Sequence, residues 1–518
     1  VDRANVYRAS NEDTWYDEML IHEDRIVVVG YSYDKAAAEF SVFTIDERGR
    51  FAREATYYIS SNDYYSGSNY ATRLVDDRLI IRTSLQLRDL DPDEPIKWPR
   101  IRRWQREGAG ETEVSPGARL YDVRDIYRPV QPTIEPALQT VSVCPLGARG
   151  AGDELTCRTT AFIAPSSIYF VSREHAYFWA TPGYDDRDGA KKAPACTPEG
   201  AATFENGVPG ALFQAPLNGG ALRFMHVRGD PNDQFAIDVD ARELRALVVW
   251  NGLCDDDAPL TVKYFRTPLG AFSAGPKAAR SGDYLNLPGP GTPVLENRFT
   301  DGALIYGGRG SWSSRPPEEN ERQASTRIVT VPIDAPEKPV VLAAPHNVIR
   351  VESLGKAGVV TGYKDDAGLS ISLIDLRGAP RVSSTVTLAQ RFESEGRSHA
   401  YNAAIEPDGS GMMGVPTVKP MEGADRWVWR SDASDVSFLS LAAQGELRPL
   451  GELTARKDAR HAGYTCEVSC VDWYGNTRPI FTGGRVFALA ATELVEGRVR
   501  DGRIEEIGRV NLTAPLRR

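Results

Sequence analysis

The chain has 518 residues, of which 41% are hydrophobic and 25% are charged, with a net charge of −10 and an isoelectric point near 5.4. This composition excludes an intrinsically disordered chain. The acidic balance disfavours a nucleic-acid partner, because phosphate binding needs clustered cations. No run approaches the roughly 20 apolar residues that a bilayer-spanning helix needs, so we expect no transmembrane segment.

A tight polar corner followed by a short apolar run recurs eight times along the chain. In chain order the corners are Glu23-Asp24, Asp76-Asp77, Pro165-Ser166, Ala241-Arg242, Asp301-Gly302, Lys356-Ala357, Gly409-Ser410 and Gly483-Gly484. Turn residues that bound β-branched and aromatic segments predict hairpin strands. Repetition of one such unit predicts an array.

The spacing of these corners, about 50 to 90 residues, is typical of a four-stranded propeller blade with inserted loops. We therefore predict an all-β fold in which residues 1–518 form a single β-propeller of eight blades, or of seven if one corner belongs to an insertion. One ring can absorb the whole length because each blade stacks only on its neighbours. The predicted blades cover approximately residues 12–62, 64–130, 138–228, 232–290, 291–345, 346–391, 398–455 and 466–513.

Six cysteines indicate the compartment. Cys144 and Cys157 flank a Gly-rich turn, Cys466 and Cys470 are separated by three residues, and Cys196 and Cys254 remain as the third pair. An even count with two local pairs predicts three disulfides formed outside the cytosol. Structural zinc, the competing interpretation, usually needs two closely spaced ligand pairs. The sequence begins at Val1 rather than Met, so we expect either a removed leader or a sequence that omits it.

Three segments carry a family resemblance. Residues 64–81 contain Tyr-Tyr-Ser-Gly-Ser-Asn-Tyr-Ala-Thr-Arg-Leu, residues 229–247 contain Asp-Gln-Phe-Ala, and residues 404–415 end in Gly-Met-Met-Gly-Val. Together they resemble the secreted bacterial and archaeal "beta-propeller domain" family of uncharacterised envelope proteins. The resemblance implies a propeller at the envelope and no established reaction. Where the family has Asn, Glu and His, this chain has Asp233, Val239 and Glu406, so a site built from those side chains is not carried over.

Acidic loops are the candidate metal sites, because calcium takes several carboxylate and carbonyl oxygens from a flexible turn. The weak calcium candidates are Asp89, Asp91, Asp93, Asp186 and Asp188. The competing interpretation of these loops is a solvated surface turn.

No catalytic residue and no other cofactor are predicted. The chain has no Gly-x-Ser-x-Gly elbow and no closely spaced histidine pair. A propeller can still gather distant residues in its axial channel, so His399, Glu406 and one or two Asp residues are kept as a set that could share a site.

We therefore predict an extracytoplasmic protein that is secreted, periplasmic or tethered to the surface, with a lipid anchor open as the means of attachment. It is expected to act as a protein-binding or assembly scaffold at the cell envelope, because a ring of blades is a rigid disc with two loop-bearing faces. Saccharide is the second expected ligand. One alternative is a secreted hydrolase or lyase that acts on polysaccharide or another polymer through the central channel, and another is a structural subunit of a larger surface complex.

Overall fold

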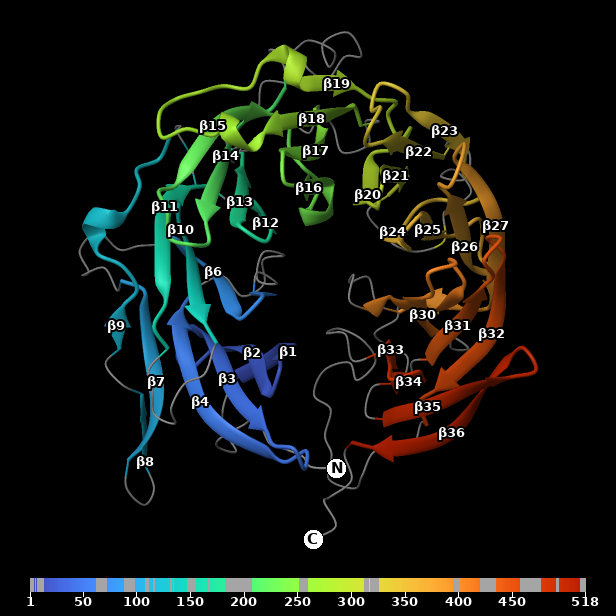
Figure 1. The fold of residues 1–518 in the computed structure, drawn as a ribbon, viewed down its shortest axis with the longest axis horizontal. Coiled ribbons are helices and arrows are strands. Elements are labelled where there is room, and N and C mark those ends of the chain that lie inside the picture. Colours follow the sequence, from blue (N-terminus) through green and yellow to red (C-terminus); the bar gives the residue numbers. More distant parts are fainter. Residues whose placement is uncertain are drawn as a thin grey trace. The chain divides into compact units, whose positions relative to one another are not determined.

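The structure is a computed structural model, and in its described part the regular structure is β-strand with a few short 3-10 helices (Figure 1). The strands form eight antiparallel sheets, numbered here in chain order. The chain divides into two compact units, one of Val1–Ala195, Thr203–Leu253 and Phe265–Tyr284, the other of Cys196–Ala202, Cys254–Tyr264 and Leu285–Arg518. The described residues are 4, 6, 14–61, 72–87, 98–107, 111–114, 117–130, 133, 135–146, 155–165, 167–181, 207–250, 260–311, 316, 326–394, 400–419, 435–456, 477–490 and 493–512.

The first unit holds the first three sheets and most of the fourth, of which residues 262–264 and 285–286 belong to the second unit. Their strand orders are β1-β2-β3-β4-β7-β8 with β9 on β7, then β11-β10-β6-β5, β12-β13-β14-β15 and β16-β17-β18-β19. The strands are β1 (Thr14–His22), β2 (Arg25–Ser32), β3 (Ala37–Ile45), β4 (Phe51–Ser60), β5 (Arg73–Val75), β6 (Arg78–Gln86), β7 (Arg100–Glu107), β8 (Glu111–Val114), β9 (Ala118–Arg119), β10 (Ala137–Pro145), β11 (Arg158–Ala164), β12 (Ser167–Val171), β13 (His175–Ala180), β14 (Pro209–Pro216), β15 (Arg223–Arg228), β16 (Ile237–Val239), β17 (Glu243–Val249), β18 (Val262–Pro268) and β19 (Tyr284–Asn286). The 3-10 helices are η1 (Val123–Asp125), η5 (Gln234–Ala236), η6 (Leu269–Ala271) and η7 (Ser281–Asp283).

The second unit holds the last four sheets. Their orders are β20-β21-β22-β23, β24-β25-β26-β27, β28-β30-β31-β32 with β29 on β30, and β33-β34-β35-β36. The strands are β20 (Val294–Phe299), β21 (Ala303–Arg309), β22 (Arg327–Pro332), β23 (Val340–Ala343), β24 (Arg350–Ser353), β25 (Ala357–Gly362), β26 (Gly368–Asp375), β27 (Arg381–Ala389), β28 (Phe392–Glu393), β29 (Asn402–Ile405), β30 (Gly411–Val418), β31 (Asp435–Leu441), β32 (Leu447–Thr454), β33 (Thr477–Thr482), β34 (Arg485–Ala490), β35 (Glu493–Arg500) and β36 (Arg503–Asn511).

Seven of the eight predicted corners lie at hairpin turns between paired strands, such as Glu23-Asp24 between β1 and β2. Glu23 has a φ of 51°, a left-handed conformation that a tight turn requires. The third corner is misplaced by one strand, because Pro165 precedes β12 and the hairpin turn of that sheet lies at residues 172–174. That turn contains neither Gly nor Asp. It is held instead by the Ser172 hydroxyl oxygen, which accepts from the His175 amide at 3.1 Å.

The predicted limits 64–130 and 138–228 also differ from the observed sheets. Strands β10 and β11 pair with β6 rather than with β12 to β15, so the second sheet runs from 73 to 164 and the third from 167 to 228. The reason is an inserted segment after β6, whose strand β7 pairs with β4 of the first sheet. An insertion that completes a neighbouring sheet leaves no signal in the spacing of turns.

Sheets next to each other in the chain pack face to face within each unit. Alternate side chains of a strand point to opposite faces of its sheet. Leu79 and Ile81 of β6 accordingly pack against the first sheet, whereas Ile80 packs against the third. Val359 and Val360 of β25 divide in the same way between the seventh sheet and the fifth. Burial of both faces explains why these strands read as continuous apolar runs.

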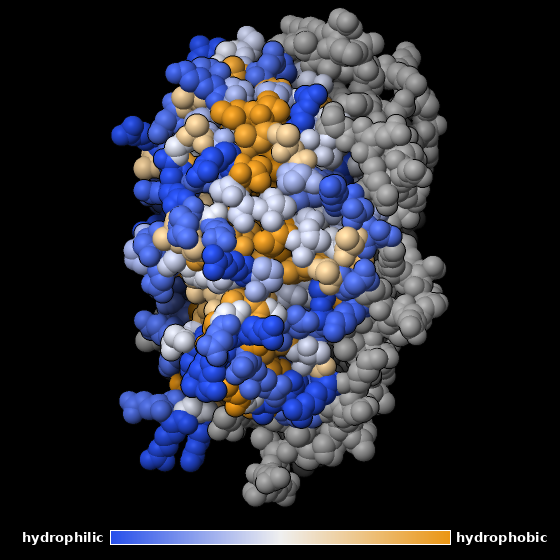
Figure 2. Space-filling model, turned by 90° about the vertical axis from the view of Figure 1, so that its right-hand side faces the viewer, coloured by the Kyte–Doolittle hydropathy of each residue, from blue (hydrophilic) through white to orange (hydrophobic). Residues whose placement is uncertain are grey.

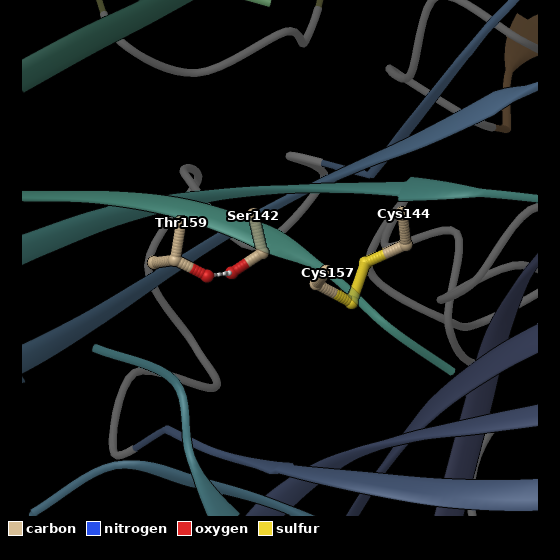
Figure 3. Close-up of a disulfide and its surroundings, with 4 residues drawn as sticks. All are labelled: Ser142, Cys144, Cys157 and Thr159. Carbon is tan, nitrogen blue, oxygen red and sulfur yellow. Dashed lines mark hydrogen bonds between the residues drawn. A yellow bond between two sulfur atoms is a disulfide. The ribbon is translucent and has the colours of Figure 1, made fainter. Parts of the chain in front are cut away.

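One disulfide, Cys144–Cys157, links β10 to the residue that precedes β11 (Figure 3). Its Cα atoms lie 4.3 Å apart. Next to it the hydroxyls of Ser142 and Thr159 share a hydrogen bond of 2.8 Å across the same strand pair. The predicted partners Cys196, Cys254, Cys466 and Cys470 lie outside the described residues.

The surface in Figure 2 shows apolar side chains gathered in patches between charged ones. Large apolar side chains exposed on the last sheet include Val499, Ile507 and Val510. Within the described residues, the structure contains no helix with the length and hydrophobicity needed to cross a bilayer.

Candidate functional site

A buried network of charges in the second unit joins the first strands of three successive sheets. Arg350 of β24 is its centre: its Nε lies 2.5 Å from Oε1 of Glu393 on β28, and its Nη1 lies 3.1 Å from Oε1 of Glu352. The second carboxylate oxygen of Glu352 binds the guanidinium of Arg298 on β20. Because strand side chains alternate, Arg350 and Glu352 lie on the same face of β24 and can share a partner.

Burial sets the protonation of this network. Burial raises the pKa of Glu393, and Arg350 partly offsets that shift. Burial by itself lowers the pKa of Arg350. The attraction of Glu393 and Glu352 is larger and raises this pKa above the usual arginine value. The Tyr363 hydroxyl accepts from the Glu393 amide at 2.9 Å, which fixes β28 against the preceding sheet. The arginine stays charged, and the network holds three strands by charge-assisted hydrogen bonds.

Two further buried arginines form ion pairs of the same kind. Arg309 at the end of β21 pairs with Glu296 of β20. Arg391, directly before β28, pairs with Asp435 of β31 and Glu452 of β32.

A cleft of about 340 Å³ opens beside Arg298 and Glu352. It is formed by the end of β24, the turn that follows it, and β29. Its lining residues are Arg298, Glu352, Ser353, Leu354, Gly355, Tyr401, Asn402, Ala403 and Ile405.

Tyr401 and Asn402 supply the uncharged polar groups of the cleft. Burial raises the pKa of the Tyr401 hydroxyl, and Glu352 adds to this shift, so the phenol stays protonated. The described hydrogen bond of this hydroxyl is a long one of 3.9 Å to Sδ of Met413. The Asn402 side-chain nitrogen donates to the Pro479 carbonyl at 3.4 Å, while its oxygen accepts from the Ala403 amide. Both side chains keep hydrogen-bonding capacity toward the cleft.

In the first unit, two of the segments that carry the family resemblance meet. Arg73 follows the first segment's aromatic run, and its Nη2 donates to Oε1 of Gln234 at 2.6 Å. Gln234 begins η5, whose N-cap is Asp233; the Asp233 carboxylate accepts from the amides of Phe235 and Ala236. Asp233 therefore has a local role in capping.

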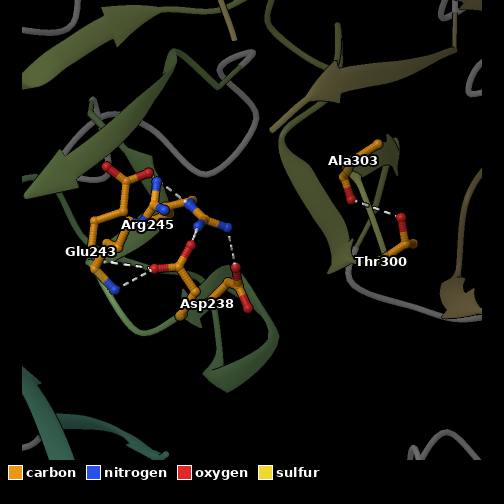
Figure 4. A network of polar contacts seen from close by, with 7 residues as sticks. Asp238, Glu243, Arg245, Thr300 and Ala303 are labelled. Atoms are coloured by element: carbon orange, nitrogen blue, oxygen red, sulfur yellow. Dashed lines mark hydrogen bonds and ion pairs between the residues drawn. The ribbon is translucent and has the colours of Figure 1, made fainter. Parts of the chain in front are cut away.

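Arg245 of β17 is, like Arg350 and Arg391, a buried arginine with several carboxylate partners (Figure 4). Its guanidinium lies 2.8 Å from Asp238 and 2.9 Å from Glu243, and it also contacts Asp240. Burial raises the pKa of Asp238, and Arg245 counteracts this shift. The cluster joins β16 to β17 and closes the turn between them.

Of the residues named from the sequence as calcium or shared-site candidates, Glu406 lies in the part of the chain that the structure describes. Asp89, Asp91, Asp93, Asp186, Asp188 and His399 are outside the described residues. Glu406 is exposed in the turn after β29, where its amide bonds to the Ser410 carbonyl. Among the described residues no group of three His, Cys, Asp or Glu side chains has the geometry to hold a metal ion.

The buried arginines were missed in the sequence, although a signal for two of them exists. Arg82 and Arg245 interrupt two of the apolar strand runs, and both side chains are buried. A charge inside a strand that is apolar on both faces requires a buried partner. Some partners lie two residues away on the same strand, as Glu243 does for Arg245. Others, such as Asp238, lie on another strand and are identified only by the packing.

No protein-family model and no curated protein matches the sequence. Among solved structures, the uncharacterized protein lmo1340 from Listeria monocytogenes EGD-e is 9% identical, with 98% of this chain and 96% of that chain covered and a TM-score of 0.36. An apocarotenoid oxygenase from Synechocystis is 12% identical over 85% of this chain and 71% of that chain, with a TM-score of 0.32. The polysaccharide lyase Uly1 is 10% identical over 67% and 81%, with a TM-score of 0.30. At these scores we draw no functional conclusion from the similarities.

Proposed function

We propose that this chain is an extracytoplasmic eight-bladed β-propeller that acts as a binding scaffold at the cell envelope. Each of the eight sheets is assigned to one blade. The face-to-face packing of successive sheets within each unit supports the assignment, because blades bury both faces against their neighbours. Class averages from negative-stain electron microscopy test it: a closed disc with eight radial densities is expected, and two separate globules would contradict the ring.

The disulfide Cys144–Cys157 supports the extracytoplasmic location, since such bonds persist in oxidising compartments. Fractionation of the cells that make the protein, followed by mass spectrometry of unreduced peptides, tests this part. Recovery of the chain only from the cytosol, with both thiols free, would contradict it.

The binding role rests on one observation, the Arg350-centred network beside the cleft. Binding sites carried by strands and supported by buried hydrogen bonds are held in a fixed geometry before the ligand arrives. Glu352 belongs to both structures, because it binds Arg350 inside the protein and lines the cleft. A preformed cleft of this size, with a few polar groups among apolar ones, is the feature expected of a binding module.

Site-specific photo-cross-linking tests the binding role. A photoreactive amino acid replaces Asn402 in the cleft or, as a matched control, Asn286, which is also an exposed asparagine on a strand. Each variant is expressed in the cells that normally make the protein and irradiated there. We expect a discrete adduct from position 402 and none from position 286. Equal labelling at both positions, or none at either, would remove the cleft as the binding site.

The competing enzyme hypothesis is a hydrolase or lyase acting on a polymer. It predicts that the purified full-length chain releases reducing ends or unsaturated products from polysaccharides, with turnover abolished by substitution of Tyr401 or Glu352. Binding without product release favours the scaffold.

A further inference from the structure

The cleft beside β24 and β29 carries no net charge. Arg298 and Glu352, the charged side chains that line it, are paired with each other. Arg350 behind them is held between two carboxylates. A ligand with a strong net charge of either sign therefore has no uncompensated counter-charge to bind.

Hydrogen-bond donors and acceptors both line the cleft. Arg298 offers N–H donors, Glu352 offers carboxylate oxygens, and Asn402 offers an amide nitrogen whose second hydrogen is not used by Pro479. The Tyr401 hydroxyl, whose described partner is a thioether at 3.9 Å, can exchange that contact for a stronger one. Neighbouring donors and acceptors of this kind match a ligand with several adjacent hydroxyls, each of which both donates and accepts.

The rest of the lining is apolar. Leu354, Ala403 and Ile405 provide aliphatic surface next to the polar wall. The volume of about 340 Å³ is at the small end of the range for ligand sites. A small ligand with one hydroxylated edge and one aliphatic face fits this division.

We propose that the cleft binds a neutral saccharide unit of a glycan. The hydroxyl groups of the sugar ring face Arg298, Glu352, Tyr401 and Asn402, and its C–H face lies on Ala403 and Ile405. The assignment rests on the proposed binding function and specifies its ligand class.

Calorimetric titration of the full-length chain tests the ligand class. The probes are neutral tri- to hexasaccharides of glucose, mannose, galactose or N-acetylglucosamine, uronic-acid oligosaccharides of the same lengths, and a mixed peptide library. We expect binding of at least one neutral series. Tyr401→Phe and Asn402→Ala should each weaken it about tenfold, the loss of one hydrogen bond of ordinary strength. Asn286→Ala, outside the cleft, should leave it unchanged, and the unfolding midpoints of all three variants should match the wild type.

The outcomes separate this inference from the broader proposal. Binding of only acidic oligosaccharides, only peptides, or no probe at millimolar concentration overturns the saccharide assignment, as does neutral-sugar binding that is insensitive to both cleft variants. If every sugar fails while the cross-link from position 402 to a protein persists, the scaffold proposal stands without the saccharide.

Discussion

Replacement of Arg350 by Met tests the energetic role of the buried charge network. The side chains of Arg350, Glu352 and Glu393 are 6%, 5% and 6% exposed, so removal of the cation leaves carboxylates that water does not reach. Glu352 keeps Arg298 as a partner, whereas Glu393 loses the ion pair described for it. Breaking a buried pair in this way costs about 3–5 kcal/mol of unfolding free energy.

The loss should depend on pH in a defined direction. Glu393 already has a raised pKa, and removal of Arg350 removes a contribution that lowers it. A carboxyl with a raised pKa in the folded state destabilises the protein as pH rises through that pKa. Arg350→Met should therefore be most destabilised at pH 7.5 and recover part of the loss near pH 5. The double variant Arg350→Met/Glu393→Gln should be more stable than the single variant at pH 7.5, because Glu352 keeps Arg298 and no buried carboxylate is left without a partner.

Guanidinium unfolding followed by tryptophan fluorescence measures these differences. The matched control is Arg448→Met, because Arg448 pairs with Glu446 at the surface and should change the unfolding midpoint far less. A single variant within about 1 kcal/mol of wild type at pH 7.5, against the 3–5 expected for a buried pair, would refute the reasoning. So would a double variant no more stable than the single one.

Three further predictions concern the stability of each unit. Burial raises the pKa of Asp230 to about 6, so Asp230→Asn should stabilise the protein by up to about 3 kcal/mol above pH 6, with no gain below pH 4. Unfolding midpoints measured across this pH range check the prediction, and a gain in stability that is constant with pH contradicts it. Replacement of Cys144 and Cys157 by Ala should cost about 3 kcal/mol under non-reducing conditions, because the bond closes a short loop in the unfolded chain. Dithiothreitol should remove the difference in unfolding midpoint between wild type and variant, and a difference that persists under reduction would contradict this. Gly308→Ala should cost about 1–3 kcal/mol, because its new methyl group meets a backbone carbonyl of β20. Gly378→Ala should be neutral, because its methyl group meets no atom. Equal unfolding midpoints for the two alanine variants would contradict this.

The arrangement of strands was largely predictable because the physics of a hairpin turn is local. Residues such as Asp76 and Gly302, both with positive φ, mark their turns through their own backbone preferences. The turn at residues 172–174 was not predicted, because a serine hydroxyl closes it without Gly or Asp. The pairing of β7 with β4 was not predicted, because strand pairing across an insertion depends on contacts between residues far apart in sequence.

The cleft could not be predicted, since its walls come from residues near 352 and near 402 that are brought together only when two sheets stack. Glu352 and Arg350 are two residues apart in sequence, which places them on one face of a strand. The sequence does not indicate that Arg298 and Glu393 complete the buried charge network. Of the predicted disulfides, the one pair inside the described residues, Cys144 and Cys157, closes across neighbouring strands, where a short sequence separation is informative.

Charges between stacked sheets supply a specificity that apolar packing lacks. A sheet held only by Val, Ile and Leu can shift by two residues and still bury the same face. Each such shift at β24 would move Arg350 away from Glu393 and leave buried charges without partners, which costs several kcal/mol. A network of this kind therefore adds little net stability over an apolar core, yet it excludes alternative registers. By fixing β20, β24 and β28 in one register, it also fixes Arg298 and Glu352 at the cleft. We infer that Glu352 has two roles: it fixes the position of the strands, and it shapes the binding surface.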